Sequence, residues 1–196
     1  MCHMPSFVSI DVETANNDAA SICQIGMVRF ANGKIVEKYN KLINPDCMFL
    51  PMNISIHGID SKKVKNAPRF FEIYDEINSW LSSGIITSHS FFDRNAIFRS
   101  IERDLLLPPN PIWIDATTII RRTWSQYSKR GYGLSNLSRD FEIEFMHHDA
   151  CEDARVSGEI LCRAIIDSGK SIDDWVQILK PKKKQPKEFV ANVYGI

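Results

Sequence analysis

The chain has 196 residues, 44% of them hydrophobic, which is enough for one domain with its own core. Its formal net charge is zero, which excludes attraction of polyanions through overall charge. Five scattered cysteines without a C-x-x-C pair argue against a disulfide framework and a structural zinc site. The chain has no signal-peptide pattern and no apolar run near the roughly 18 residues of a membrane span, which predicts a cytoplasmic protein.

The first third of the chain predicts three antiparallel strands. Residues 7–13 alternate between apolar and polar with period two, so Asp11 and Glu13 lie on the same face of the strand. The runs 22–30 and 34–43 flank an Asn-Gly pair, the strongest short-range signal of a hairpin. Residues 54–59 contain His57, which is interpreted as a loop or core histidine.

From residue 68 onward, helical and extended patterns alternate, which predicts an α/β fold. Helical periodicity predicts helices over 70–81, 92–105, 117–124, 134–141 and 149–166. Short apolar runs predict strands over 85–88 and 112–115. We expect a domain over residues 6–167 and a C-terminal extension over 168–196, with an apolar turn near 175–179 and then a Lys- and Pro-rich tail.

Two acids lie where a helix would normally carry an apolar side chain. Asp93 and Asp153 each share a helical face with apolar residues at spacings of three, four and seven. A carboxylate on such a face costs several kcal/mol without a positive partner, and neither face offers a lysine or arginine at a matching position. Divalent cations are the simplest partners.

Packing both helices over the sheet, with their first turns at the first strand, would bring together four carboxylates: Asp11, Glu13, Asp93 and Asp153. Oxygen ligands suit Mg²⁺ or Mn²⁺ and disfavour zinc. Two such ions can activate a water and stabilise both oxygens of an in-line phosphoryl displacement. The predicted reaction class is phosphodiester hydrolysis.

His148, five residues before Asp153, is a candidate general base, because imidazole with a pKa near 6.5 can accept a proton at neutral pH. By spacing alone, its neighbour His147 is an alternative. Each residue also has a plainer interpretation: Asp93 and Asp153 as helix N-caps, the acids of the first strand as solvated groups, and His57 as a loop or core histidine. The joint pattern favours the metal site.

Three segments together resemble the DEDDh group of 3′→5′ exonucleases in the DnaQ-like superfamily. The resemblance covers residues 6–167 and rests on Asp11-Val12-Glu13-Thr14, on Phe92-Asp93 and on His148-x-Ala150-x-x-Asp153. Within this group, the chain is most similar to the proofreading subunit of bacterial DNA polymerase III. The resemblance implies an RNase H-like α/β fold, with a mixed five-stranded sheet flanked by helices.

The resemblance also implies roles for the site residues. It assigns His148, rather than His147, as the general base. The ligands of two Mg²⁺ or Mn²⁺ ions would be Asp11, Glu13, Asp93 and Asp153. It places at the terminal nucleotide Thr14, Ala15 and His57. Beside Asp93, the aromatic residues Phe91 and Phe92 are candidates for stacking on a terminal base.

The implied function is release of mononucleotides from the 3′ end of single-stranded DNA, with DNA favoured over RNA. One departure concerns substrate preference: Ser88 and His89 stand where many family members carry His-Asn. Two alternatives stay open, a 3′→5′ exoribonuclease that trims short RNA and a non-catalytic nucleic-acid-binding module that associates with a polymerase.

Overall fold

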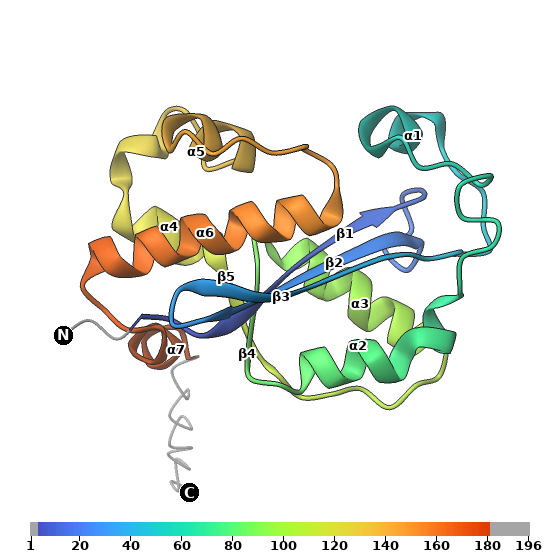
Figure 1. The fold of residues 1–196 in the computed structure, drawn as a ribbon, viewed down its shortest axis with the longest axis horizontal. Helices are drawn as coiled ribbons and strands as arrows, with labels where there is room; N and C mark the ends of the chain where they lie inside the picture. Colours follow the sequence, from blue (N-terminus) through green and yellow to red (C-terminus); the bar gives the residue numbers. More distant parts are fainter. Residues whose placement is uncertain (1–3, 181–196) are drawn as a thin grey trace, which may run out of the picture.

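The computed structural model describes residues 4–180, and a five-stranded mixed sheet forms the centre of the molecule (Figure 1). The strand order is β3-β2-β1-β4-β5. Neighbouring strands are antiparallel among the first three, β1 (Phe7–Thr14), β2 (Ile22–Ala31) and β3 (Lys34–Leu42). They are parallel from β1 to β4 (Ile85–Ser88) and from there to β5 (Ile112–Asp115). This arrangement confirms the predicted mixed α/β sheet.

The predicted hairpin joins β2 and β3. Asn32 and Gly33 both have positive φ, at 50° and 71°, which a two-residue turn between antiparallel strands requires.

The preceding strand β1 lies at the centre of the sheet and is buried on both faces. Its side chains Val8 and Ile10 enter one apolar cluster, and Phe7 enters another. The central position of β1 makes its C-terminal end a rigid base for a site.

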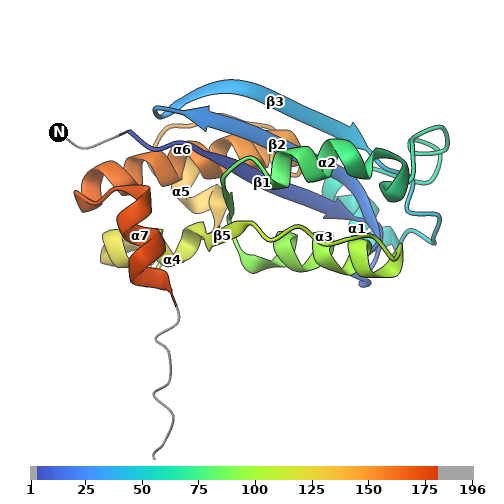
Figure 2. The same cartoon turned by 90° about the horizontal axis from the view of Figure 1, so that it is seen from below.

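Helices cover both faces of the sheet (Figure 2). One apolar cluster combines β1 and β2 side chains with α4 (Ala116–Thr123), α5 (Leu134–Asp140), α6 (Ala150–Ser168) and α7 (Ile172–Leu179). The cluster on the opposite face includes α2 (Tyr74–Leu81) and α3 (Phe91–Arg103). Short 3₁₀ turns precede α2 and follow α4, at Phe70–Ile73 and Ser125–Ser128. Within residues 4–180, no helix has the length and apolar character to cross a membrane.

The long helix α6 lies unusually close to the sheet at its N-terminal end. A Cβ atom on Gly26 of β2 would lie 2.2 Å from the backbone of Ala150 and Cys151, so only glycine permits this approach. Gly26 is also the cross-strand partner of Asp11. The close contact therefore holds the first turn of α6 beside the acids of β1.

A helix that the sequence did not predict, α1 (Pro51–His57), occupies most of residues 54–59, and His57, interpreted as a loop or core histidine, is its last residue. Proline at the start and Gly58 in the left-handed conformation at the end are ordinary helix signals. The helix is only two turns long and buries none of its residues, so it has no apolar face for periodicity to detect.

The apolar turn predicted near residues 175–179 belongs to a further helix, α7. In α7, Ile172 and Trp175 pack into the cluster beneath α6. Ser171 caps the helix and forms a capping box with Asp174. The division into 6–167 and 168–196 stays a prediction, and the Lys- and Pro-rich tail from residue 181 lies outside the described residues.

Candidate active site

Three carboxylates meet where β1 ends beneath the first turn of α6. Asp11 and Glu13 come from β1 and Asp153 from α6, and one oxygen of each lies within 4.8 Å of the others. The two acids of β1 share a face because their spacing matches the period of a strand. Tertiary packing thus produces the convergence expected for these three residues.

Asp93 approaches the same place from α3. Its Oδ1 accepts a hydrogen bond of 3.1 Å from the backbone N–H of Val12, between the two acids of β1, and its side chain is 4% exposed. It does not belong to the group whose oxygens lie within 4.8 Å of one another, but its charge acts on Asp11 and Glu13. Asp93 therefore forms one wall of the acidic cluster.

Neither of the helical acids serves as an N-cap, which was the plainer interpretation of each. Ser90 caps α3 by accepting a hydrogen bond from the N–H of Phe92. Asp149 caps α6 and accepts from two backbone N–H groups of the first turn. The carboxylates of Asp93 and Asp153 are consequently free of the structural role that sequence alone allowed.

Burial raises the pKa of all four acids, and neighbouring carboxylates add to the effect. Burial is the largest cause, followed for Glu13 by repulsion from Asp153, and the pKa of Glu13 rises to about 8. Burial raises the pKa of Asp93 to about 7 and that of Asp153 to about 6, and it holds the pKa of Asp11 well above its usual range. Among residues 4–180, no lysine or arginine forms an ion pair with these acids.

The residues fit a divalent cation of the Mg²⁺ or Mn²⁺ type. All four side chains offer carboxylate oxygens, the ligands that such hard ions prefer. The Oδ1 atom of Asp153 is buried and has no hydrogen-bond partner within the described chain, although Oδ2 has one. A buried carboxylate oxygen without a donor is costly unless a cation meets it.

His148 lies beside the cluster, on the loop before α6. Its backbone N–H donates to Asp153 Oδ2 at 3.0 Å, and its φ of 68° is a left-handed conformation that histidine adopts more readily than most residues. Burial, and then the neighbouring His147, lower the pKa of His148. The imidazole is therefore mainly neutral at neutral pH and able to accept a proton.

Helix α1 holds the end of β1, and its His57 lines the same cleft as His148. The carbonyl of Thr14 accepts from Asn53 Nδ2 at 2.8 Å and from His57 Nε2 at 3.2 Å. His57 Nδ1 accepts from the N–H of Ile59, which leaves the hydrogen on Nε2. His57 thus positions the turn that carries Thr14, and Asn53 is a partner in this role that sequence reasoning missed.

The remaining substrate candidates differ in exposure. Phe91 and Phe92 are 51% and 49% exposed at the start of α3, so their rings are accessible. Ala15 is fully buried, its N–H donates to Ser21 and its carbonyl accepts from Leu50. Because its side chain and both backbone groups are used inside the protein, Ala15 shapes the turn after β1 and presents no group at the surface.

The two residues that replace the usual His-Asn bond to groups outside the acidic cluster. Ser88 is fully buried, accepts a hydrogen bond from the indole N–H of Trp113 and donates to the carbonyl of Ser90. His89 Nε2 lies 2.9 Å from the carbonyl oxygen of Tyr132. These positions connect β4 to β5 and to the loop before α5.

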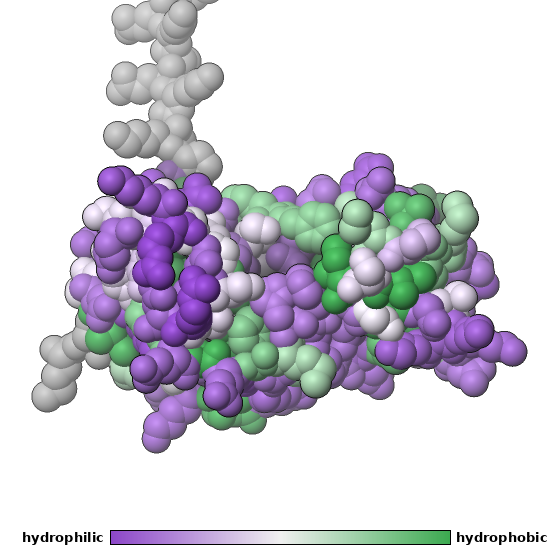
Figure 3. Space-filling model, turned by 90° about the horizontal axis from the view of Figure 1, so that it is seen from above, coloured by the Kyte–Doolittle hydropathy of each residue, from purple (hydrophilic) through white to green (hydrophobic). Residues whose placement is uncertain are grey.

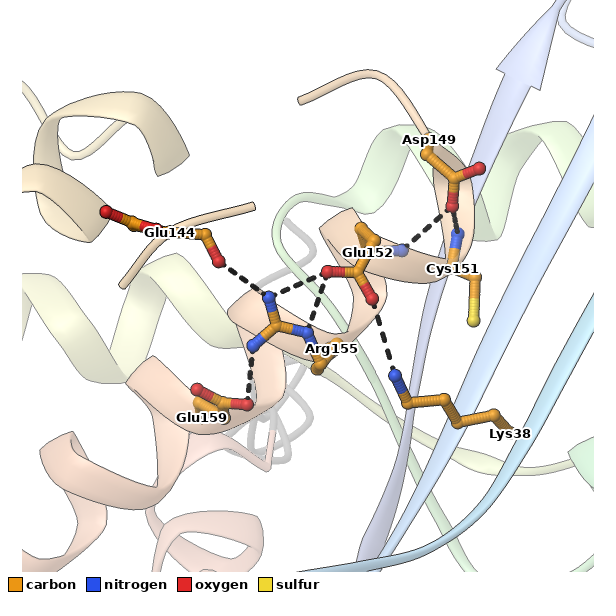
Figure 4. A network of polar contacts seen from close by, with 7 residues as sticks. All are labelled: Lys38, Glu144, Asp149, Cys151, Glu152, Arg155 and Glu159. Carbon is orange, nitrogen blue, oxygen red and sulfur yellow. Dashed lines mark hydrogen bonds and ion pairs between the residues drawn. The ribbon is translucent and has the colours of Figure 1, made fainter. Parts of the chain in front are cut away.

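Sequence reasoning also missed the polar contacts that hold α6 and its preceding loop. Gln24 of β2 donates to Asp149 Oδ2 and accepts from the N–H of Ala150. Arg155 pairs with Glu152 and Glu159 and donates to the carbonyl of Glu144 (Figure 4). Gln24 interrupts the apolar run of β2 and is only 6% exposed. A glutamine at such a position indicates a buried hydrogen-bond partner, which could have predicted its contact with α6.

A cleft of about 660 Å³ opens beside His148. Its lining comes from β2, β3, α1 and the loop before α6, and includes Gln24, Asn40, His57, Lys63, His147 and His148. The surface between α5 and α1 is hydrophilic, and apolar side chains gather on the side of α1 (Figure 3). Exposed apolar residues there are Met48, Met52 and Ile56. The cleft beside the acidic cluster is therefore lined by polar and apolar side chains alike.

Comparison with known proteins decides the family. Residues 8–161 match the RNase T family, described as "Exonuclease". The chain belongs to this exonuclease family. The match confirms the class predicted from the three motifs, a DnaQ-like 3′→5′ exonuclease of the DEDDh group, which is a hydrolase acting on phosphodiester bonds.

The curated relatives of this exonuclease are much longer than the chain itself. The chain is 26% identical, over 81% of its residues, to a PolC-type DNA polymerase III of Caldanaerobacter subterraneus subsp. tengcongensis, of which it covers 11%. It therefore spans about a tenth of that curated relative.

Solved structures share the fold of this exonuclease. Exonuclease X in complex with 5′ overhanging duplex DNA has a TM-score of 0.69 and 24% identity, over 88% of this chain and 98% of that one. The nuclease domain of 3′hExo, a DEDDh family member bound to rAMP, has a TM-score of 0.68 and 16% identity, over 86% and 95%. These likenesses confirm the RNase H-like fold.

Proposed function

We propose that this exonuclease removes mononucleotides one at a time from the 3′ end of single-stranded DNA. The observation that carries the proposal is the meeting of Asp11, Glu13 and Asp153 within 4.8 Å, with a ring nitrogen of His148 within the same distance of Asp153. Such a cluster suits hydrolysis of a phosphodiester, because the reaction needs both a base and a place for positive charge next to the phosphate.

Asp11, Glu13 and Asp153, with Asp93 as the fourth wall, would hold two Mg²⁺ or Mn²⁺ ions. When bound, these ions supply activation of the attacking water and stabilisation of the oxygens that gain charge. Without cations, four clustered carboxylates repel the phosphate backbone, so substrate binding depends on the same residues that serve hydrolysis.

His148 would act as the general base. Its backbone N–H is held by Asp153, so the ring stands next to the carboxylates, and its lowered pKa keeps it ready to accept the proton of the attacking water. On the opposite side, the Thr14 carbonyl held by His57 and the exposed rings of Phe91 and Phe92 would position the terminal nucleotide.

DNA is the favoured substrate because the similar proteins include DNA polymerases and an exonuclease bound to duplex DNA. RNA is the second candidate, since one protein of similar fold binds rAMP. Ser88 and His89, which depart from the family pattern, bond to Trp113 of β5 and to Tyr132 in the loop before α5.

A labelled oligonucleotide tests the proposal. With Mg²⁺ or Mn²⁺, a 5′-labelled single strand should give a ladder of progressively shorter products, while a 3′ label should appear at once as mononucleotide. Asp11→Ala should lower kcat/KM by about a hundredfold or more, because it removes a ligand and the ligands act as a unit. Asp173→Ala, an exposed acid of α7, serves as the control and should leave the rate unchanged.

Matched DNA and RNA strands in competition decide the substrate, since discrimination depends on contacts to the 2′-hydroxyl. Preferential loss of the RNA strand would replace DNA by RNA in the proposal. Equal product from wild type and Asp11→Ala would contradict the assigned site. Binding of single strands without any product would instead support a non-catalytic module.

A further inference from the structure

A second group of potential metal ligands adjoins the acidic cluster. One ligand atom from each of His147, His148 and Asp153 lies within 4.8 Å of the other two. This group differs chemically from the cluster of carboxylates because two of its three donors are imidazole nitrogens. The two groups share Asp153.

The local backbone builds this group. Successive side chains of an extended chain point to opposite sides, but the left-handed conformation at His148, with φ of 68°, turns the chain. The ring centroids of His147 and His148 consequently lie 3.8 Å apart. Phe145 packs on the ring of His147 at a centroid distance of 5.3 Å, and the N–H of His148 holds Asp153 Oδ2.

The donors match a transition ion rather than magnesium. Two imidazoles and a carboxylate are a common set for Zn²⁺, with the fourth tetrahedral position left to water, whereas Mg²⁺ prefers oxygen alone. Both histidines are half-buried and line the cleft of about 660 Å³, so an ion can reach them from solvent. The buried Oδ1 of Asp153, without a hydrogen-bond partner in residues 4–180, is a further donor that needs a positive partner.

We propose that His147, His148 and Asp153 form a zinc site, and that zinc bound there switches the exonuclease off. The inhibition rests on the proposed function, because His148 is the assigned base and Asp153 an assigned ligand. An ion held by both residues withdraws them from hydrolysis at once. Binding of zinc does not depend on the proposed function.

The first experiment measures direct binding of zinc. It uses a double variant, Asp11→Asn and Glu13→Gln, in which the acidic cluster has lost two of its carboxylates. Calorimetry with Zn²⁺, and visible absorption with Co²⁺ as its spectroscopic substitute, should show one site in this double variant. Adding His147→Gln should raise the zinc dissociation constant by at least about tenfold, since even residues behind the ligands change metal affinity by that factor.

His147→Cys, measured under reducing conditions, separates a ligand from a structural role. A thiolate is also a good zinc ligand, so the cysteine should restore most of the affinity lost with glutamine. Far-ultraviolet circular dichroism and thermal unfolding verify that the variants fold. No zinc binding by the folded double variant, or equal binding with and without His147→Gln, would overturn the zinc site.

Activity is measured second, at constant Mg²⁺ and rising Zn²⁺. Zinc should inhibit the wild type, and His147→Gln should shift the inhibitory concentration upward by at least about tenfold, the same factor as for binding. Inhibition undiminished in His147→Gln would place the effect at the carboxylates and overturn the switch. A wild type inactive with Mg²⁺ would refute the proposed function, while the calorimetry would still decide the site.

Discussion

At the scale of single residues, His148 uses its main chain and its side chain separately. The N–H holds Asp153 at 3.0 Å, which any residue able to adopt the left-handed conformation can do. The imidazole has no substitute of similar shape that titrates near neutral pH. A change of side chain therefore removes the base while the backbone contact to the carboxylate is retained.

We expect His148→Gln to lower kcat by about 10²- to 10⁴-fold, the usual contribution of a general base, with Mg²⁺ affinity little changed. Steady-state kinetics and a metal titration measure the two effects. His147→Gln is the matched control and should keep its activity in zinc-free buffer. If His147→Gln lost this activity while His148→Gln kept it, His147 would be the base.

At the scale of elements, the site depends on how closely α6 approaches β2. The contact of Gly26 with the backbone of Ala150 leaves no room for a side chain. Since Asp153 lies in the first turn of α6, a displaced helix end carries this carboxylate away from Asp11, its neighbour across the cluster.

Gly26→Ala should therefore lower both stability and activity. We expect a loss of about 1–3 kcal/mol in the free energy of unfolding, typical of overpacking in a core, and weaker binding of Mg²⁺. Chemical denaturation and metal titration provide the readouts. Gly133→Ala is the control, because a Cβ atom there would meet nothing within 4 Å and φ is −63°. Unchanged metal affinity in a folded Gly26→Ala variant would argue against this view of α6.

The loop before α6 has its own anchor in Arg155, whose side chain is only 15% exposed and pairs with Glu152 and Glu159. Arg155→Met should free the carbonyl of Glu144, and we expect a loss of stability of about 1–3 kcal/mol with a lower kcat, because the loop carries the base. The exposed pair of Arg99 and Glu102 supplies the comparison: Arg99→Met should cost under about 1 kcal/mol. Similar losses for both variants would show that Arg155 is no special anchor.

At the scale of the whole molecule, the acidic cluster couples folding to pH and to divalent ions. In the unfolded chain, aspartate and glutamate titrate near about 4, whereas in the fold the pKa of Asp153 is about 6, that of Asp93 about 7 and that of Glu13 about 8. Raised pKa values mean that the folded state binds more protons than the unfolded one. In the metal-free protein, these groups therefore add to the free energy of unfolding. Their contribution is fully present below pH 4 and is lost as the pH rises from 4 to 8.

We expect the Tm of metal-free protein to fall between pH 6 and pH 8, and the rise in Tm on adding Mg²⁺ to be larger at pH 8, because the ion binds the charged carboxylates. Thermal unfolding with Mg²⁺ or with a chelator measures both effects. The double variant Asp11→Asn, Glu13→Gln should flatten the pH dependence. A Mg²⁺ effect independent of pH would contradict the coupling.

Patterns along the chain were sufficient to predict most elements, because burial leaves a period of two or 3.6 in the order of apolar residues. The five strands and the faces of α3 and α6 follow from this rule. Helix α1 escaped because it buries no side chain, and the roles of Gln24 and Arg155 escaped because their partners come from other elements or from backbone atoms.

The order of residues along the chain accounts for the local periods, for the four acids with their histidine and, through the three motifs, for the exonuclease family. Which atoms meet follows from packing: Asp93 accepts a hydrogen bond from Val12, Ala15 is enclosed, and His147 lies close to Asp153. The physical reason is that periodicity records which face of an element is buried, whereas the distance between groups as far apart in the chain as Asp11 and Asp153 is determined by packing, as at Gly26.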